Sequence, residues 1–154
     1  MSGKFEDRLA ELNIALPNSP APAANYVPYV QTGKLVYVSG QISMDSGGLI
    51  CGKLGDGFPI EEAYNAARAC GINLIAQLKS ACSGDLDRLV RVVKLNGFVN
   101  ATEDFSDHPK VVNGASDLMV EVFGDQGRHA RAAVGSSSLP LGVVVEVEGV
   151  FEIG

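Results

Sequence analysis

The hydrophobic pattern is most regular at the C-terminal end of the chain. Between positions 143 and 153 the odd positions are apolar or glycine, whereas the even positions include Glu146, Glu148 and Glu152. Because successive side chains of a strand point to opposite faces, this period of two predicts a strand with one apolar and one acidic face. The same criteria predict further strands at residues 27–32, 35–43, 89–99 and 127–134.

Two longer segments show the spacing of amphipathic helices. Apolar residues recur every three or four positions in residues 59–82 and in residues 108–123, which predicts two helices with one apolar face each. Asp107 is expected to cap the second helix and Gly124 to end it. A shorter helix is predicted at residues 4–16 by the spacing of its apolar side chains.

The N-terminal part of the chain differs from the rest in composition. Residues 17–28 contain four prolines, which break a helix and favour an extended path. We therefore predict an N-terminal arm at residues 1–24, made of the short helix and the proline-rich segment, and one domain at residues 25–154. The arm is too short to fold alone, so we expect it to pack on the domain or on a neighbouring subunit.

The order of the predicted elements favours an α+β fold. Two helices that each have a single apolar face are expected to lie on one face of a single sheet, with an irregular hairpin in the glycine-rich segment 44–58. The other face of the sheet still carries apolar side chains, such as Val92, Phe98 and Val134. Since no further predicted element covers that face, we expect association with other copies of the chain to bury it.

Composition and charge limit the possible functions. Of the 154 residues, 46% are hydrophobic and 19% are charged, which is typical of a globular domain with a core. The net charge of −6 argues against nucleic acid as a partner, because phosphate binding uses basic patches. No apolar run approaches the roughly 18 residues of a membrane span. Three cysteines without CxxC spacing favour a reducing, cytoplasmic location.

Arg131 is the main candidate for chemistry, because it lies among small residues in a predicted strand. Glu146 lies in the strand that follows. In one interpretation the two side chains meet across a cleft, where the guanidinium binds a carboxylate and the glutamate orients a water or moves a proton. In the other interpretation Arg131 forms a structural salt bridge with Glu146 or Glu148. The spacing of these residues leaves both interpretations open.

The remaining candidates for chemistry are histidines and cysteines. We expect His108 to be a solvated loop residue, and for His129 we favour a structural role over a place in a pocket. Cys70 and Cys82 fall on the apolar stripe of the first long helix and are predicted core residues, whereas Cys51 lies in a glycine loop. No metal-ligand spacing, P-loop or nucleophile elbow occurs in the sequence.

Several segments together resemble the RidA/YjgF family, also called endoribonuclease L-PSP. The last segment is the most specific, because it combines Arg131, small residues, Leu139-Pro140 and a strand of alternating acids. The resemblance covers about residues 25–153, and the arm resembles a longer branch of the family that carries such an extension. The matching segments are PYVQTGKLVYVSGQI (28–42), EEAYNAARACGINL (61–74), LVRVVKLNGFV (89–99), VNGASDLMVEVFG (112–124) and HARAAVGSSSLPLGVVVEVEGVF (129–151).

The resemblance implies a chorismate-mutase-like α+β fold that assembles as a homotrimer, with clefts between its subunits. It also implies hydrolytic deamination of reactive enamine or imine intermediates, such as 2-aminoacrylate, to 2-keto acids and ammonia, without a metal or organic cofactor. Two alternatives stay open. One is a non-catalytic module that binds small molecules such as 2-keto acids, and the other is the endoribonuclease of the family label.

The family motif also implies roles for individual residues of this chain. By match to the motif, Arg131 would clamp the substrate carboxylate, and Glu146 would position or activate a water. Four further residues would form the substrate site, namely Tyr29 in the lining of the cleft, Ser39 and Gly40 in its floor, and Asn113 near the start of the second long helix.

Overall fold

The computed structural model describes residues 3–19 and 25–154 of the chain. Residues 20–24, part of the segment for which an extended path is predicted, lie outside the described residues, and the boundary after residue 24 stays a prediction. The elements are α1 (Lys4–Glu11), β1 (Tyr29–Thr32), β2 (Leu35–Ile42), β3 (Met44–Asp45), β4 (Gly48–Leu49), α2 (Ile60–Ala81), η1 (Leu86–Arg88), β5 (Leu89–Asn100), α3 (His108–Phe123), η2 (Gly124–Gly127), β6 (Ala130–Ser136), η3 (Pro140–Gly142) and β7 (Val145–Ile153), where η denotes a 3-10 helix.

The main sheet has the strand order β1-β2-β7-β5-β6, so β1 and β6 are its two edges. Strands β1, β2, β7 and β5 pair antiparallel with their neighbours. Strand β6 runs parallel to β5, because the chain crosses through α3 between them. Strands β3 and β4 form a separate small hairpin in the glycine-rich segment, as predicted.

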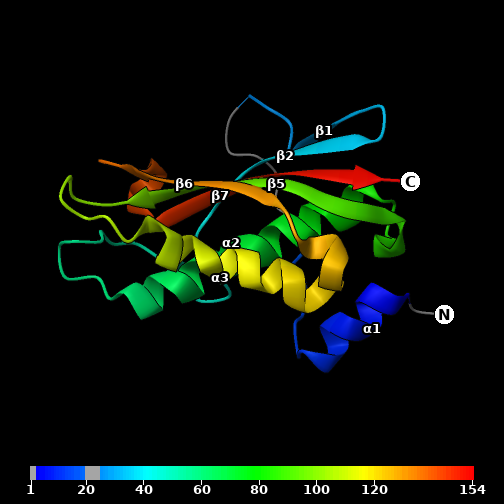
Figure 1. The fold of residues 1–154 in the computed structure, drawn as a ribbon, viewed down its shortest axis with the longest axis horizontal. Coiled ribbons are helices and arrows are strands. Elements are labelled where there is room, and N and C mark those ends of the chain that lie inside the picture. Colours follow the sequence, from blue (N-terminus) through cyan, green and yellow to red (C-terminus); the bar gives the residue numbers. More distant parts are fainter. Residues whose placement is uncertain (1–2, 20–24) are drawn as a thin grey trace.

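The hydrophobic core lies between the sheet and the two long helices. Helices α2 and α3 cover the same face of the sheet (Figure 1), which confirms the predicted layers. Along β7 the odd positions from Val145 to Ile153 are buried, as the period of two predicts. Cys70 and Cys82 belong to this core, also as predicted, and Cys51 is exposed. None of the helices in the described residues has the length and apolar character needed to cross a membrane.

Two glycines allow α2 and α3 to approach each other closely. A side-chain carbon at Gly71 would lie 2.7 Å from the side chain of Leu118, and one at Gly114 would overlap the backbone carbonyl oxygen of Tyr64. Backbone atoms cannot move aside as the end of a flexible side chain can, because the interior is closely packed. Gly114 therefore fixes the separation of the two helices at this point.

The opposite face of the sheet carries none of the described helices (Figure 1). Val30, Tyr37 and Val134 are each about half exposed. Their exposure agrees with the predicted uncovered apolar face, and its burial by other copies of the chain stays a prediction. The pattern predicts Val92 on this face as well, which is wrong. Val92 is buried in the core, because irregularities in the ladder of β5 on both sides of it interrupt the alternation.

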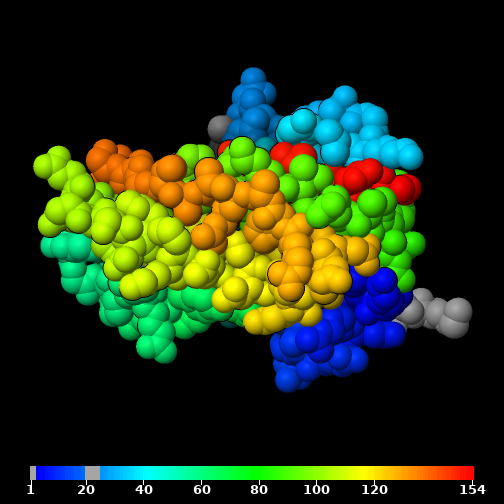
Figure 2. All heavy atoms as spheres, viewed as in Figure 1, coloured from blue at the N-terminus to red at the C-terminus, as the bar shows by residue number. Residues whose placement is uncertain are grey.

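Helix α1 packs on the rest of the molecule through buried side chains. Phe5 and Leu9 belong to the main core, and the Phe5 ring meets Phe123 edge-on with 4.9 Å between the ring centroids. Figure 2 shows α1, in dark blue, against the yellow and orange end of α3 and η2. The predicted helix at residues 4–16 is too long, because the chain leaves the helix before Asn13, which has a left-handed backbone conformation (φ 57°).

Two local predictions fail at the ends of elements near the site. The side chain of Asp107 does not cap α3, and instead its carboxylate lies 3.6 Å from Lys110 Nζ. The strand predicted at residues 127–134 begins and ends later, because the chain first completes η2 before entering β6. Arg131 nevertheless lies in β6, as predicted.

Candidate functional site

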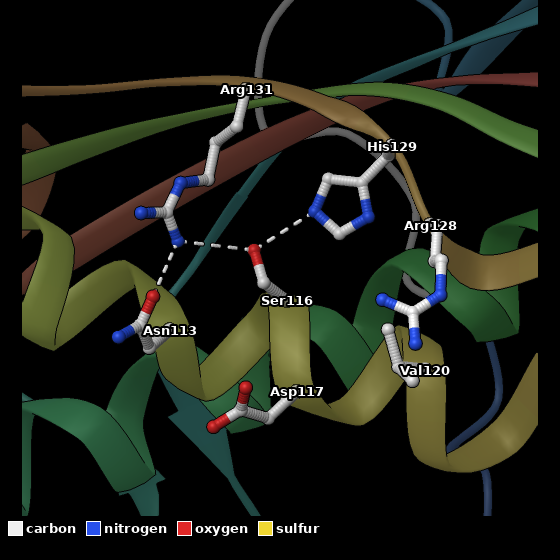
Figure 3. A pocket seen from close by; sticks show the side chains of 7 residues that line it. All are labelled: Asn113, Ser116, Asp117, Val120, Arg128, His129 and Arg131. Atoms are coloured by element: carbon white, nitrogen blue, oxygen red, sulfur yellow. Dashed lines mark hydrogen bonds between the residues drawn. The ribbon is translucent and has the colours of Figure 1, made fainter. Parts of the chain in front are cut away.

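An open pocket of about 270 Å³ lies between α3 and the edge strand β6. Figure 3 shows that side chains from both elements point into the same space. We call it the Arg131 pocket. Its lining is mostly polar and charged, and consists of Asn113, Ser116, Asp117, Val120, Arg128, His129 and Arg131. The structure thus brings two of the predicted site residues, Asn113 and Arg131, into one pocket.

Arg131 points toward α3 because of its register in the sheet. It pairs with Leu95 of β5, which is buried against the helices, and in-register neighbours share a face. Its Nη1 donates hydrogen bonds to Asn113 Oδ1 (2.7 Å) and Ser116 Oγ (3.2 Å). Within the described residues, Nε and Nη2 have no hydrogen-bond partner and no carboxylate forms an ion pair with Arg131. Neutral groups therefore orient a half-buried guanidinium that can still bind an anion.

His129 continues this chain of hydrogen bonds away from Arg131. Its Nε2 lies 2.8 Å from Ser116 Oγ, and its Nδ1 lies 2.6 Å from the carbonyl oxygen of Gly127. Burial, followed by the nearby charge of Arg131, lowers the pKa of His129 below its usual 6.5, so the imidazole is neutral at pH 7. His129 therefore lies in the pocket wall. From the sequence we favoured a structural role for this residue over a place in a pocket.

The other charged residues of the Arg131 pocket already have partners. Asp117 accepts a 2.6 Å hydrogen bond from the Tyr64 hydroxyl, and this bond is the main reason why the pKa of Tyr64 rises to about 12. Arg128 Nε lies 3.3 Å from Asp125 Oδ1 in an exposed ion pair. Among the residues of this pocket, Arg131 is therefore the cation best placed to bind an external carboxylate.

Glu146 and Gly40 form a second group, on the face of the sheet away from the helices. A side-chain carbon at Gly40 would overlap the Glu146 carboxylate, so glycine at this position leaves room for it. Burial, and after it the charge of Glu148, raises the pKa of Glu146. Ser39, next to Gly40, donates a 2.8 Å hydrogen bond to the carbonyl oxygen of Val27. We call Ser39, Gly40 and Glu146 the Glu146 cluster.

Tyr29 lies apart from both groups within one chain. It pairs with Val38 at the start of the edge strand β1, and Val38 is buried on the helix side. The Tyr29 hydroxyl accordingly reaches α2, where it lies 3.4 Å from Ser80 Oγ. The structure therefore does not bring Tyr29 to Arg131 or to Glu146 in a single chain.

Arg131 and Glu146 lie on opposite faces of the sheet. Phe98 of β5 pairs with both Val134 and Glu146, so these side chains share the open face, whereas Arg131 faces the helices. Strand β5 also separates β6 from β7. A salt bridge of Arg131 with Glu146, or a contact between them across a cleft of one chain, is therefore a wrong prediction. A cleft between subunits stays a prediction.

Ser116, which contacts both Arg131 and His129, is a pocket residue that sequence reasoning missed. Asn113 and Ser116 are three positions apart, so they lie on one face of a helix. His129 and Arg131 are two positions apart, so they lie on one face of a strand. These two spacings were visible in the sequence and would have suggested a polar pocket between the second long helix and the strand that follows it.

A group of carboxylates outside the pocket has the spacing of a cation site, and consists of Glu6, Asp85 and Asp87. Backbone N–H groups account for its arrangement. Asp87 accepts hydrogen bonds from the N–H groups at the start of α1, and Glu6 accepts one from Leu86. These carboxylates therefore serve as helix caps that join α1 to η1.

Comparison with known proteins identifies the family. The family model described as "YjgF/chorismate_mutase-like, putative endoribonuclease" matches residues 6–152. The chain is a member of the YjgF/RidA family. The predicted chorismate-mutase-like α+β fold is thereby confirmed. The YjgF/RidA match covers α3, β6 and all but the last residue of β7, and thus both the Arg131 pocket and the Glu146 cluster.

Two relatives and one solved structure cover most of the chain. Protein TCP17 of Trypanosoma cruzi is 48% identical over 99% of this chain and 96% of its own length. A 2-iminobutanoate/2-iminopropanoate deaminase of Dermatophagoides farinae is 30% identical over 91% of this chain and 94% of its own length. The crystal structure of Atu1372 from Agrobacterium tumefaciens, of unknown function, has 46% identity and a TM-score of 0.90, and covers 97% of this chain and 92% of its own.

Proposed function

We propose that this protein hydrolyses small enamine or imine acids, such as 2-aminoacrylate, to 2-keto acids and ammonia. The observation that carries the proposal is the half-buried guanidinium of Arg131, which Asn113 and Ser116 orient and which forms no ion pair within the described residues. Its planar fork matches the carboxylate that substrate and product share. The 30% identical relative, named for the deamination of imino acids, supports this reaction type.

The proposed reaction makes modest demands on the site, because imines already hydrolyse in water. Binding of the carboxylate by Arg131 holds the neighbouring imine carbon in place. A water positioned next to that carbon then reacts faster, because the two reacting groups are already close and oriented. Glu146 is the group that we propose to position this water. The raised pKa of its carboxyl brings it closer to neutral pH than that of an ordinary glutamate, which suits a group that exchanges protons.

In the proposed active site, the Arg131 pocket and the Glu146 cluster come from different subunits. Strand β6 is an edge of the sheet, and the face that carries Glu146 keeps half-exposed apolar side chains. Packing this face against a neighbouring copy in a closed ring buries those side chains and can join the two groups. We propose a cytoplasmic homotrimer, with Tyr29 in the lining of the shared cleft and a small imino or keto acid as its ligand.

The alternative is a module that binds small molecules without turnover, and two similar proteins leave this alternative open. TCP17 and Atu1372, which are 48% and 46% identical to this chain, carry no activity in their names. Such a module would use the same guanidinium to hold a 2-keto acid. It differs from the enzyme in a single measurable respect, which is the absence of any rate enhancement.

The decisive experiment is a coupled assay. A pyridoxal-phosphate dehydratase releases 2-aminoacrylate from serine, and pyruvate formation is followed with the wild type, Arg131→Ala and the control Arg88→Ala, which removes an arginine outside the Arg131 pocket. We expect acceleration by the wild type and by Arg88→Ala but not by Arg131→Ala. Pyruvate binding that requires Arg131, without acceleration, would support the binding module. If a folded wild type shows neither pyruvate binding nor acceleration, the deaminase and the binding module are both excluded.

A further inference from the structure

We propose that Ser116 and His129 form a proton relay in the Arg131 pocket. In this relay Ser116 takes a proton from the attacking water that Glu146 of a neighbouring copy positions, and His129 acts through Ser116 as a positioning residue that holds the proton in transit. The chemistry of the relay rests on the proposed deaminase function. Its hydrogen-bond arrangement is a separate statement about the protein that can be tested without substrate.

The partners of His129 determine which ring nitrogen carries the proton. The carbonyl oxygen of Gly127 can only accept a hydrogen bond, so Nδ1, 2.6 Å away, is the protonated nitrogen. In the neutral imidazole Nε2 is then an acceptor, and the Ser116 hydroxyl, 2.8 Å away, donates to it. A backbone carbonyl thus orients the imidazole so that its basic nitrogen faces a hydroxyl group.

Ser116 has one acceptor position left for a water. A hydroxyl group donates one hydrogen bond and accepts two. Its proton points to His129, and one of its lone pairs accepts the bond from Arg131 Nη1 at 3.2 Å. Within the described residues no partner occupies the other lone pair. A water bound there would lie beside a carboxylate held by Arg131, close to the carbon that it must attack.

The proton transfers balance over one turnover. The water oxygen bonds to the imine carbon of an iminium acid, and the π pair of C=N moves to nitrogen. The water proton passes to Ser116 Oγ while the Ser116 proton passes to His129 Nε2. The imidazolium then returns a proton through Ser116 to the amino group. The C–N bond breaks with its electron pair on nitrogen, and the remaining hydroxyl proton goes to the departing ammonia, which leaves a 2-keto acid and ammonium.

Burial and the charge of Arg131 favour the neutral form of His129. Arg131 of β6, Arg128 before it and Asp117 of α3 share the pocket with the imidazole, and Arg91 of β5 donates to the carbonyl oxygen of Arg128. Burial is the largest cause that lowers the pKa of His129, the hydrogen bond with the Gly127 carbonyl opposes it, and the charge of Arg131 adds to the lowering. The imidazole therefore stays able to accept a proton at a more acidic pH than a solvated histidine.

The first test measures the tautomer of the wild type without substrate. The chain has two histidines, so long-range proton–nitrogen spectra of protein labelled with nitrogen-15 histidine contain two ring systems. His108→Gln leaves the signals of His129 alone. We expect the Nδ1–H tautomer at His129, with a titration midpoint below 6.5. An Nε2–H tautomer would overturn the relay.

The second test uses the coupled assay. His129→Gln is expected to lower kcat by about 100-fold with little change in KM, because proton transfer is lost while carboxylate binding stays. The part of the activity loss on acidification that comes from protonation of His129 should disappear in this variant, whereas any part that comes from Glu146 should remain. Ser116→Ala should show the same fall in kcat, whereas Ser116→Thr, which keeps the hydroxyl, should recover most of it. His108→Gln is the matched histidine control and should behave as the wild type.

The outcomes separate the relay from the proposed function. If the wild type accelerates the reaction and His129→Gln keeps both its kcat and its acid limb, the relay is wrong and the deaminase function stands. If the wild type gives no acceleration, the proposed function fails, and the catalytic role of the relay fails with it. Should Ser116→Ala not fold, the wild-type tautomer and the pH profile of His129→Gln decide the question.

Discussion

Asn113 Oδ1 accepts a 2.7 Å hydrogen bond from Arg131 Nη1, so an uncharged group holds the guanidinium in place. Asn113→Asp keeps the shape but adds a carboxylate that competes with the ligand. We expect Asn113→Asp to weaken pyruvate binding by about 100-fold, and Asn113→Ala by about 10-fold, because a hydrogen bond to a charged group contributes about 1.5–3 kcal/mol. Calorimetric titration measures both. Equal losses in the two variants would show that the added charge has no effect.

Mixed oligomers of the proposed trimer test whether the Arg131 pocket and the Glu146 cluster meet between subunits. Arg131→Ala and Glu146→Gln each remove one half of the proposed site. In trimers formed by co-expression of the two variants, about one quarter of the interfaces pair the two intact halves by chance. We therefore expect roughly that fraction of wild-type activity, and almost none from either variant alone. Native mass spectrometry verifies the subunit mixture. Fully mixed trimers without activity would mean that both halves must come from the same chain.

Gly40→Ala should lower activity with little effect on stability. The new methyl group overlaps the Glu146 carboxylate, which is the flexible end of a side chain and can swing away from the site. We expect the variant to lose activity to the same extent as Glu146→Gln while its free energy of unfolding changes by less than about 1 kcal/mol. Gly47→Ala is the control, because its new methyl group meets Asp45 at 3.2 Å, far from Glu146 in the sequence. Full activity in Gly40→Ala would contradict the proposed role of Glu146.

Glu146→Gln should stabilise the protein at neutral pH. The folded protein raises the pKa of this carboxyl from 4.5, mainly through burial, so above pH 4.5 the unfolded chain binds fewer protons than the folded one. The free energy of unfolding therefore falls as the pH rises from 4.5 through the raised pKa. We expect the variant to gain up to about 1 kcal/mol at pH 7, a small value because the group is only half buried.

The measurement for Glu146→Gln is urea unfolding of the wild type and the variant at several pH values and one protein concentration. Below pH 4.5 the two proteins should have the same stability, because the carboxyl is then protonated in both states. A variant that is equally stable at every pH would show that burial places no strain on the charged form of Glu146.

The sequence predicted the layers of this fold well because its periodicities are local. The alternation along β7 depends only on which face of one strand is buried, and the spacing in α3 depends only on one helix. Val92 was assigned to the wrong face because its burial depends on register shifts between β5 and β7. The hydrophobic pattern of β5 alone does not indicate such shifts. The end of α1 was missed because a left-handed asparagine stopped a pattern that continues to residue 16.

The site was predicted less well than the fold, since it depends on pairing between strands. Arg131 was found from its surroundings and from the family resemblance, but its direction follows from the parallel pairing with Leu95, which spacing does not determine. The antiparallel pairing of Glu146 with Phe98 of β5 places Glu146 on the other face. Ser116 was missed because its spacing from Asn113 points to a pocket only when it is combined with the spacing of His129 and Arg131 in the strand that packs beside the helix.

Gly114 has no side chain that could contact a ligand, yet it lies in the turn of α3 that carries both Asn113 and Ser116. Any side chain at this position would drive α3 away from α2, and both hydrogen-bond acceptors would leave the guanidinium of Arg131. Selection for the chemistry of the pocket would therefore act on a residue without a functional group. In the descendants of this protein, we expect the glycine to persist for as long as the arginine does, and to be lost soon after the arginine is lost.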